Sequence, residues 1–182
     1  MEQTQNNLDK GSKCTCNCEC NSVKAKKSQN NQYFDQQREV AAVASGFPVT
    51  ASSEYNPDHS IHRCMINQSR VRQGAAAWQA GFNEIGQWIQ VCLMTPRYVT
   101  SVSIQGRQNK EQWVTKFKIM YSVDGVQWQY HENGREFAGS VDQFTIVHHK
   151  FEDFFLARTV RILPTEWKEE MSMKFEVYFL SE

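Results

Sequence analysis

Strict alternation of side chains over residues 114–122 constrains the fold more than any other feature of this sequence. One side of the segment carries Thr115, Phe117, Ile119 and Tyr121, and the other carries Val114, Lys116, Lys118 and Met120. A period of two residues is that of a half-buried β-strand. The Asp124-Gly125 pair that follows readily takes the positive φ angles of a tight two-residue hairpin turn. We therefore predict that the chain doubles back antiparallel at this dipeptide.

Further segments show the same alternation and are separated by turn residues. They are residues 47–52, 88–93, 99–104, 144–147, 159–162 and 172–179, with Pro96 between the second and the third. A helical turn is expected only at residues 39–44, and no helical periodicity follows Ala44. Many short alternating strands separated by turns indicate an all-β chain, an antiparallel β-sandwich and most economically a jelly roll.

The first part of the chain differs in composition from the rest. Residues 1–32 are rich in Asn, Gln, Lys and Ser and contain almost no large apolar side chains. Such a segment cannot bury enough surface to offset the entropy lost on ordering. We therefore predict a disordered tail over residues 1–32 and one domain over residues 33–182, since a chain of 182 residues has room for one substantial core.

The six cysteines are unevenly distributed, and the tail holds four of them: Cys14, Cys16, Cys18 and Cys20. This spacing puts the four sulfurs on one side of an extended backbone, where thiolates could chelate a soft metal such as zinc or cuprous copper. Common structural zinc sites use two Cys-x-x-Cys pairs instead, so the match is loose. Intermolecular disulfides and a reduced, flexible tail are the alternatives. Cys64 and Cys92 could form a disulfide if the fold brings them close enough, but small buried thiols are the preferred interpretation.

The charge of the chain argues against a nucleic-acid partner, and its hydropathy argues against a membrane-spanning helix. The formal net charge is zero and the basic residues are spread along the chain, so the footprint of a nucleic-acid binder is missing. No stretch approaches the roughly 20 apolar residues that cross a bilayer. Residues 1–30 lack the apolar segment of a secretory signal. We expect a protein that is cytoplasmic when synthesised, and action outside the cell would need a non-classical route or a lost leader.

A series of short motifs resembles the discoidin domain family, also called the C-type domain of coagulation factors. The motifs follow the family's order and approximate spacing: Trp88-Ile89-Gln90-Val91, Gln105-Gly106-Arg107, Trp113-Val114-Thr115, Tyr121-Ser122, Asp124-Gly125, Trp128, Arg161-Ile162 and Phe175-Glu176-Val177. The sequence SSEYNPDH and the absence of cysteines near both domain ends are more similar to slime-mould discoidins than to coagulation factors. Cys92 departs from the family, which usually has an acidic residue there.

The resemblance implies a ligand surface made by loops at one end of the sandwich, matched here by residues 54–59, 69–74 and 108–111. A sugar needs an aromatic face and planar polar groups. The residues that could supply them are Tyr55, Asn56, Asp58, His59, Arg72, Gln108 and Asn109. The resemblance therefore predicts a non-catalytic lectin module for galactose-like or N-acetylgalactosamine-like glycans on cell surfaces or outside cells, acting in adhesion or aggregation. Weak single sites imply a homo-oligomer, because several copies raise avidity.

Two alternatives come from other classes of protein. Attachment to anionic phospholipid uses large apolar residues at the loop tips together with Lys or Arg. The three segments offer one large ring, Tyr55, and the acidic side chains of Glu54, Asp58 and Glu111, which favours a glycan. The other alternative is a protein-interaction module whose cysteine tail responds to metal or redox state.

Catalysis and cofactors find little support in the sequence. It contains no Gly-x-Ser-x-Gly, His-Glu-x-x-His or phosphate-cradling glycine motif, so no catalytic residue is predicted. His148 and His149 are adjacent in an alternating segment and should face opposite ways. No cofactor is required. Calcium stays an alternative because discoidin-like sugar modules sometimes hold it, although the carboxylate-rich loop that hard cations favour is not visible.

Overall fold

The longest strands form where the side chains alternate. In the computed structural model, which describes residues 38–68 and 76–181, they are β4 (Ile89–Gln105), β5 (Trp113–Ser122), β8 (Val147–Lys168) and β9 (Ser172–Leu180). The short strands are β1 (Glu39–Ala41), β2 (Val49–Ala51), β3 (Trp78–Gln79), β6 (Gln129–Tyr130) and β7 (Phe137–Ala138). Helical structure in these residues is limited to the 3-10 turns η1 (Pro57–His59), η2 (Ile61–Arg63) and η3 (His131–Gly134). The predicted all-β class is confirmed, and no helix of the described part is long and apolar enough to cross a membrane.

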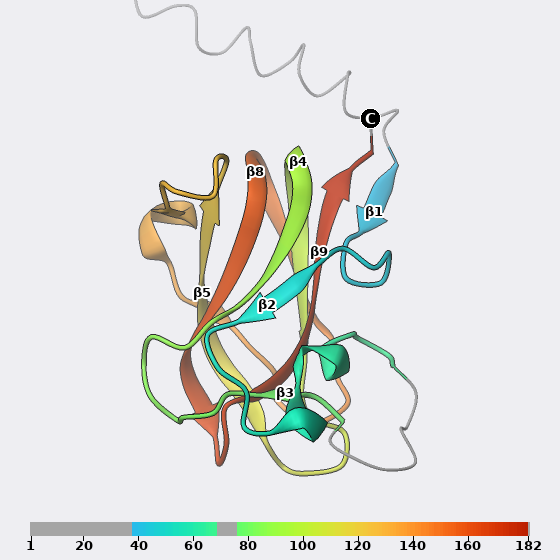
Figure 1. Cartoon of the computed structure of the whole chain (residues 1–182), viewed down its shortest axis with the longest axis vertical. Coiled ribbons are helices and arrows are strands. Elements are labelled where there is room, and N and C mark those ends of the chain that lie inside the picture. Colours follow the sequence, from blue (N-terminus) through green and yellow to red (C-terminus); the bar gives the residue numbers. More distant parts are fainter. Residues whose placement is uncertain (1–37, 69–75, 182) are drawn as a thin grey trace, which may run out of the picture. The chain divides into compact units, whose positions relative to one another are not determined.

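The named strands pair antiparallel in the order β1-β9-β4-β8-β5-β6, with β2 added to β4, β3 to β9 and β7 to β5. Figure 1 shows β5, β8, β4 and β9 side by side along the long axis. The pairing of β4 with β8 shifts register between Cys92 and Arg97, where Met94 has a φ of 66°. This irregularity bends β4 and accommodates Pro96. The two segments that the sequence separates at Pro96 therefore form one long strand.

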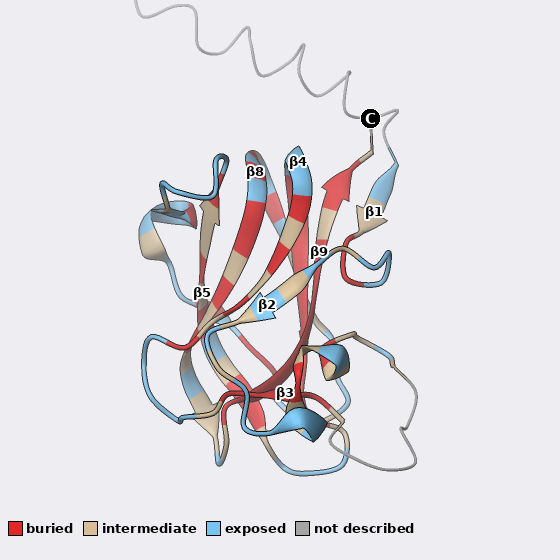
Figure 2. Cartoon of the chain, viewed as in Figure 1, coloured by how far each residue is buried: buried red, intermediate tan, exposed pale blue. Residues whose placement is uncertain are grey.

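The core lies between the long strands, whose buried segments Figure 2 shows in red. Phe117 and Ile119 of β5 pack there with Ile162 of β8, as their alternation predicts. In β5 the register shifts around Lys116, so both Val114 and Phe117 turn inward although they are three residues apart. A β-bulge of this kind changes which face a side chain takes, and simple alternation does not reveal it.

Two local predictions are corrected by distant pairing and by a side-chain cap. The helical turn expected at residues 39–44 is reduced to one i→i+4 hydrogen bond, from the Ser45 N–H to the Ala41 carbonyl at 3.0 Å, because Glu39–Ala41 pairs with β9 as β1. The predicted strand at residues 144–147 begins only at Val147. The carboxylate of Asp142 accepts hydrogen bonds from the backbone N–H groups of Phe144 and Thr145, at 2.7 and 2.6 Å, and holds them in a loop.

The predicted two-residue turn at Asp124-Gly125 is also wrong, although the chain does reverse there. Gln129 of β6 pairs with Tyr121 of β5, so the connection is longer than two residues. Gly125 has the expected positive φ of 83°. The Asp124 carboxylate instead accepts the N–H groups of the two residues after Gly125, each at 2.8 Å, which lengthens the turn.

The end of this connection is fixed by an arginine that lies between two tryptophan rings. The Arg161 guanidinium carbon is 4.0 Å from the ring centroid of Trp88 and 3.8 Å from that of Trp128. Arg161 Nε and Nη2 both donate to Gln90 Oε1, at 3.0 and 2.8 Å. Stacking on both faces and two hydrogen bonds to one amide oxygen therefore hold this arginine in place.

One buried histidine gives the fold a predictable response to acid. The His131 ring packs against Phe151 and Phe155, each at 4.4 Å between centroids, and burial lowers its pKa, although the nearby Glu132 carboxylate opposes the shift. The unfolded chain therefore binds a proton at a higher pH than the folded chain does. We expect the free energy of unfolding to fall as the pH drops below about 6.5 toward the folded pKa of His131.

Urea unfolding between pH 5 and pH 7.5 measures this effect against two variants. His131→Phe should show a weaker loss of stability on acidification, because the titrating ring is gone. His62→Gln, at an exposed position, should keep the wild-type dependence. Equal pH dependence in wild type and His131→Phe would contradict the assignment.

Candidate functional site

Two of the loops expected to bind ligand lie at the same end of the sandwich, the lower end in Figure 1. Gln79 of β3 links them. Its backbone carbonyl accepts the N–H of Tyr55 at 3.0 Å, and its side-chain Oε1 accepts from Arg107 Nη1 at 3.0 Å. Residues 54–59 and 107–112 are therefore connected through one buried glutamine of the sheet.

A buried arginine closes the loop 107–112 from inside. Arg107 is only 6% exposed, its Nε donates to Asn109 Oδ1 at 2.8 Å, and its Nη1 also donates to Gln112 Oε1 at 2.7 Å. Burial lowers the pKa of the Arg107 guanidinium, and the negative charge of Glu170 opposes this shift. An arginine starts from so high a pKa that it remains protonated. The loop is thus built around a fixed positive charge.

The neighbouring glycine lets this loop approach the residues before β8. A Cβ atom at Gly106 would clash with the backbone of Asp142 and Gln143. Only glycine fits this contact. The Gln105-Gly106-Arg107 motif therefore combines a close backbone approach with a buried cation.

The loop 54–59 is shaped by an asparagine cap. Asn56 Oδ1 accepts the N–H of Asp58 at 3.0 Å and lies 2.6 Å from His59 Nδ1. Pro57 follows the cap as the first residue of η1. The Tyr55 ring meets the His59 ring edge-on, at 5.2 Å between centroids, and Tyr55 is 59% exposed. The loop therefore presents an open aromatic ring beside an imidazole.

The charges around His59 show how close the two loops are. Burial lowers the pKa of His59, the positive charge of Arg107 lowers it further, and Lys110 acts in the same direction. The negative charge of Asp58 opposes them without reversing the result. His59 is therefore neutral at pH 7, and the site combines a neutral imidazole with two cations of the loop 107–112.

The structure brings together most of the sugar-binding residues that the sequence predicts. Tyr55, Asn56, Asp58 and His59 share one loop, and Gln108 and Asn109 lie in the adjacent loop, half-buried and exposed respectively. Arg72, the loop 69–74 and the tail cysteines Cys14, Cys16, Cys18 and Cys20 fall outside the described residues and stay predictions. Sequence reasoning missed Gln79 and Arg107 as parts of this site, and it included Lys110 only as a member of the segment 108–111. For Arg107 the signal was present, in the motif that contains it.

A fourth loop at this end was not anticipated. Residues 81–87 pack against the first loop, because Gly81 N–H donates to Ser53 Oγ at 2.9 Å. Asn83 ties the loop to the turn after β8, with Nδ2 2.5 Å from Glu170 Oε2. Phe82 and Ile85 are 64% and 69% exposed. Tyr55 is therefore not the only large apolar side chain at the loop tips.

The acidic side chains counted at the tips are partly engaged. Glu54 Oε1 accepts the N–H of Ile61 at 2.9 Å, and Glu111 pairs with Lys168 at 2.9 Å. In the sequence, three carboxylates argue against binding to anionic phospholipid. Two of these three therefore already have a hydrogen-bond or ion-pair partner within the protein. This weakens the charge argument that the sequence suggests.

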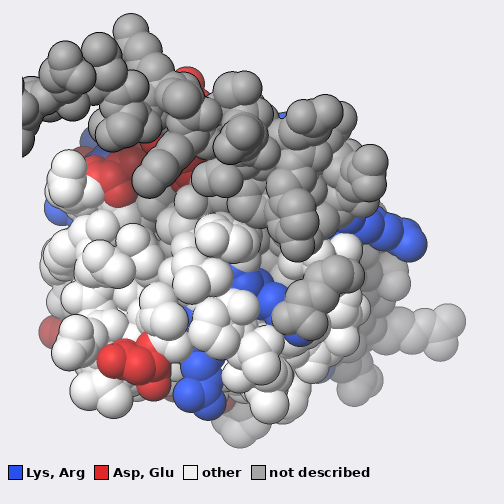
Figure 3. All heavy atoms as spheres, turned by 90° about the horizontal axis from the view of Figure 1, so that it is seen from above, with Lys and Arg blue, Asp and Glu red and all other residues white. Residues whose placement is uncertain are grey.

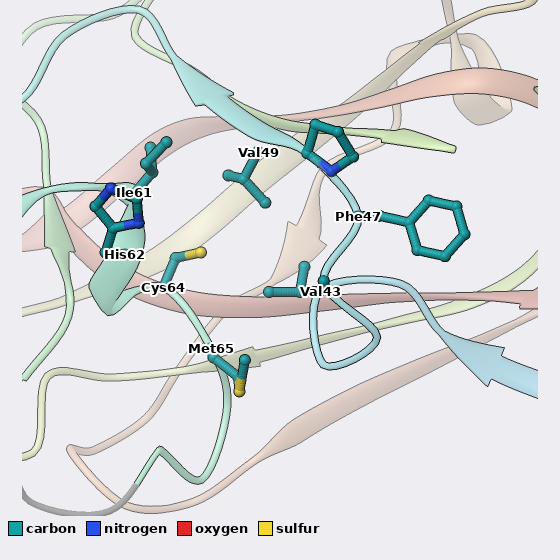
Figure 4. Close-up of a pocket in the computed structure, with 9 residues that line it drawn as sticks. Val43, Phe47, Val49, Ile61, His62, Cys64 and Met65 are labelled. Atoms are coloured by element: carbon teal, nitrogen blue, oxygen red, sulfur yellow. The ribbon is translucent and has the colours of Figure 1, made fainter. Parts of the chain in front are cut away.

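A separate pocket of about 370 Å³ lies between the turn after β1 and η2. In Figure 4 the side chains of Val43, Val49 and Cys64 converge on it. Burial, reinforced by the charge of Glu176, raises the pKa of the Cys64 thiol to about 12, so the sulfur stays protonated and is a poor nucleophile. The lining is mostly apolar, whereas a sugar requires several polar groups. The pocket is not the candidate sugar site.

Neither the opposite end of the domain nor any cluster of metal-binding groups gives a second candidate site in the residues that the structure describes. Figure 3 views the end opposite the candidate site and shows basic and acidic side chains scattered among uncharged ones. In residues 38–68 and 76–181, no group of three or more His, Cys, Asp or Glu side chains is placed to hold a metal ion. His148 and His149 bind different partners, Ser103 Oγ and the Ala138 carbonyl oxygen.

A β-sandwich with an exposed aromatic ring and polar loops gathered at one end defines a class of ligand-binding modules built on jelly-roll folds. A model of the F5/8 type C domain matches residues 48–177. The chain therefore belongs to the F5/8 type C, or discoidin, domain family. This confirms the resemblance and the predicted jelly-roll fold.

The relatives include discoidins of a slime mould and a mammalian protein. A discoidin-1 polypeptide of Dictyostelium discoideum is 33% identical over 134 residues, covering 71% of this chain and 53% of that protein. Lactadherin of Mus musculus is 36% identical over 116 residues, covering 61% of this chain and 24% of that protein. The chain thus spans about half the length of the discoidin it matches.

Solved structures agree with the fold. Discoidin II from Dictyostelium discoideum has a TM-score of 0.76 at 27% identity, and the match covers 79% of this chain and 59% of that one. The family 32 carbohydrate-binding module of C. perfringens NanJ, solved in complex with galactose, has a TM-score of 0.57 at 18% identity, covering 78% of this chain and 99% of that one. The second likeness shows the fold alone.

Proposed function

We propose that this domain is a non-catalytic carbohydrate-binding module that recognises a galactose-like or N-acetylgalactosamine-like sugar. The observation that carries the proposal is the placement of the exposed Tyr55 ring, His59 and Asn109 at one end, on loops joined through Gln79 and Arg107. An aromatic ring covers the apolar face of a sugar, and planar polar groups bind its hydroxyls. The discoidin relatives and the galactose complex of a protein with the same fold support this proposal.

Removing the aromatic ring should weaken sugar binding without unfolding the domain. Tyr55→Ala should reduce affinity for the preferred sugar about tenfold, since stacking contributes on the order of 1 kcal/mol beyond the buried area. The free energy of unfolding should change by less than about 0.5 kcal/mol, because the ring is exposed. A glycan array followed by calorimetry on the best sugar measures the first quantity, and urea unfolding measures the second.

Tyr130→Ala is the matched control, because Tyr130 is 49% exposed on β6, outside the loops of the site. It should bind sugar like the wild type. An array without any specific signal for the wild type, or equal affinity of Tyr55→Ala, would remove the proposed site.

A second function is favoured by the fourth loop. Phe82 and Ile85 are exposed on the loop 81–87, and large apolar side chains at loop tips suit insertion into a phospholipid surface. Phosphatidylserine vesicles included in the same experiments separate the two functions. Sedimentation with vesicles at physiological salt, together with a blank array, would favour lipid.

We further propose that the domain acts in cell adhesion or aggregation as a homo-oligomer. A shallow sugar site on loop tips binds weakly, and several sites on one assembly raise avidity without new contacts. Sedimentation velocity on the full chain tests this directly. A monomer at the concentrations that agglutinate glycan-coated beads would contradict it.

A further inference from the structure

We propose that His59 determines the hydrogen-bond polarity of the sugar site. Its ring is held as the Nδ1–H tautomer, so that Nε2 accepts a hydrogen bond from a sugar hydroxyl, and protonation of the ring weakens sugar binding. This inference rests on the proposed function and assigns one residue's role within it.

The tautomer follows from the contacts of Asn56. The Asn56 side-chain atom that receives the Asp58 N–H at 3.0 Å must be the oxygen, because a backbone N–H needs an acceptor. The same oxygen lies 2.6 Å from His59 Nδ1. An amide oxygen cannot donate, so Nδ1 carries the proton. In a neutral ring Nε2 is then a bare acceptor.

The other acceptors of this loop are largely occupied. Asn56 Oδ1 receives two donors, and Glu54 Oε1 receives the Ile61 N–H. Asp58 keeps a carboxylate on the same turn and is the second acceptor available to a ligand. No protein donor to His59 Nε2 occurs among residues 38–68 and 76–181. Nε2 is therefore a fixed acceptor beside the Tyr55 ring, and a sugar hydroxyl that bonds to it does so as the donor.

Acidification reverses this polarity. When the ring gains a proton, Nε2 becomes a donor and the site loses the acceptor for that hydroxyl. The groups that face His59 and set the pH of this change are Asp58 on its own turn and Arg107 and Lys110 on the adjacent loop. The hydroxyl can then bond to the ring only by turning to accept, and loss of the bond that it donated should reduce affinity roughly three- to tenfold.

The experiment measures the tautomer and the pH dependence separately. Long-range 1H–15N correlation spectra of the imidazole groups, assigned with His59→Gln, report which nitrogen is protonated at pH 7.5. Titration with N-acetylgalactosamine and with galactose between pH 4.5 and pH 8 reports affinity. The wild-type chain should show a protonated Nδ1, and its affinity should fall on the acidic side.

Two variants change the charge next to the His59 ring and keep the ring itself. Asn56→Asp keeps an acceptor for the Asp58 N–H and adds a negative charge, which raises the pKa of His59. Lys110→Gln removes a positive charge that lowers this pKa. In both variants the loss of binding should move to higher pH. Lys150→Gln removes an exposed charge on β8 and should leave the profile unchanged.

The outcomes separate this inference from the proposed function. A protonated Nδ1 together with the two shifts supports it. Sugar binding with a protonated Nε2, or with profiles that neither variant moves, overturns the inference and leaves the sugar site standing. Absence of binding to either sugar at every pH overturns the proposed function and this inference together.

Discussion

Replacing Arg107 by alanine should lower the free energy of unfolding by about 2 to 4 kcal/mol and abolish sugar binding. The guanidinium bonds Gln79, Asn109 and Gln112 while 6% exposed. Its removal leaves three amide oxygens in or next to the protein interior without their donor, and each unsatisfied buried group costs about 1 to 3 kcal/mol before water or relaxation offsets part of it. Urea unfolding and titration with the preferred sugar measure the two losses.

Arg107→Lys and Arg158→Ala make the test specific. Lysine keeps the positive charge but places it on one compact group that cannot reach all three partners of the arginine. Stability and sugar affinity should therefore fall in Arg107→Lys, but by less than in Arg107→Ala. Arg158 is exposed on β8, and its replacement should change neither quantity. If Arg107→Ala unfolds at the wild-type urea concentration or binds sugar normally, the loop 107–112 does not depend on its buried cation.

Replacing Trp78 by alanine should cost about 3 to 5 kcal/mol, the range observed when a large buried aromatic side chain is truncated. Trp78 is 0% exposed and packs in the core from β3. Its Nε1 also donates to the backbone carbonyl of Ser53 at 3.1 Å, immediately before the loop 54–59. The same side chain therefore supports the core and anchors the aromatic loop of the site.

Trp78→Phe separates these two roles. Phenylalanine keeps an apolar ring but cannot donate to Ser53, so we expect a folded domain, destabilised by about 1 to 3 kcal/mol, with weakened sugar binding. Trp167→Phe, at a half-buried position of β8, is the matched control and should bind normally. Denaturant unfolding together with sugar titration of all three variants gives the comparison. Wild-type affinity in Trp78→Phe would show that the hydrogen bond to Ser53 does not hold the loop.

The strands that could be predicted are those with one buried face. In β5 the alternation of Phe117 and Ile119 with lysines marks the core side directly, because a strand half exposed to water must alternate. β1 could not be predicted in this way. Glu39–Ala41 has helix-favouring composition and becomes a strand because β9 offers it a partner far along the chain.

The site residues also differ in whether local sequence could predict them. The loop 54–59 was recognisable from its local turn chemistry, since Asn56 and Pro57 cap a short 3-10 turn and leave Tyr55 exposed. Arg107 was visible only as part of a motif. Its role depends on Gln79, which lies 28 positions away in sequence, and a local pattern contains no information about such a partner.

By itself, the sequence determined the class of fold and the succession of the main strands along the chain. Both follow from the period of the side chains and from turn chemistry, which are local properties. It also determined the family, through motifs in a fixed order. Only the tertiary structure decided that the loops 54–59 and 107–112 meet, that Phe82 and Ile85 join them at the same end, and that His59 stands neutral beside two cations. These facts arise from packing between distant segments, where burial and neighbouring charges set the state of each group.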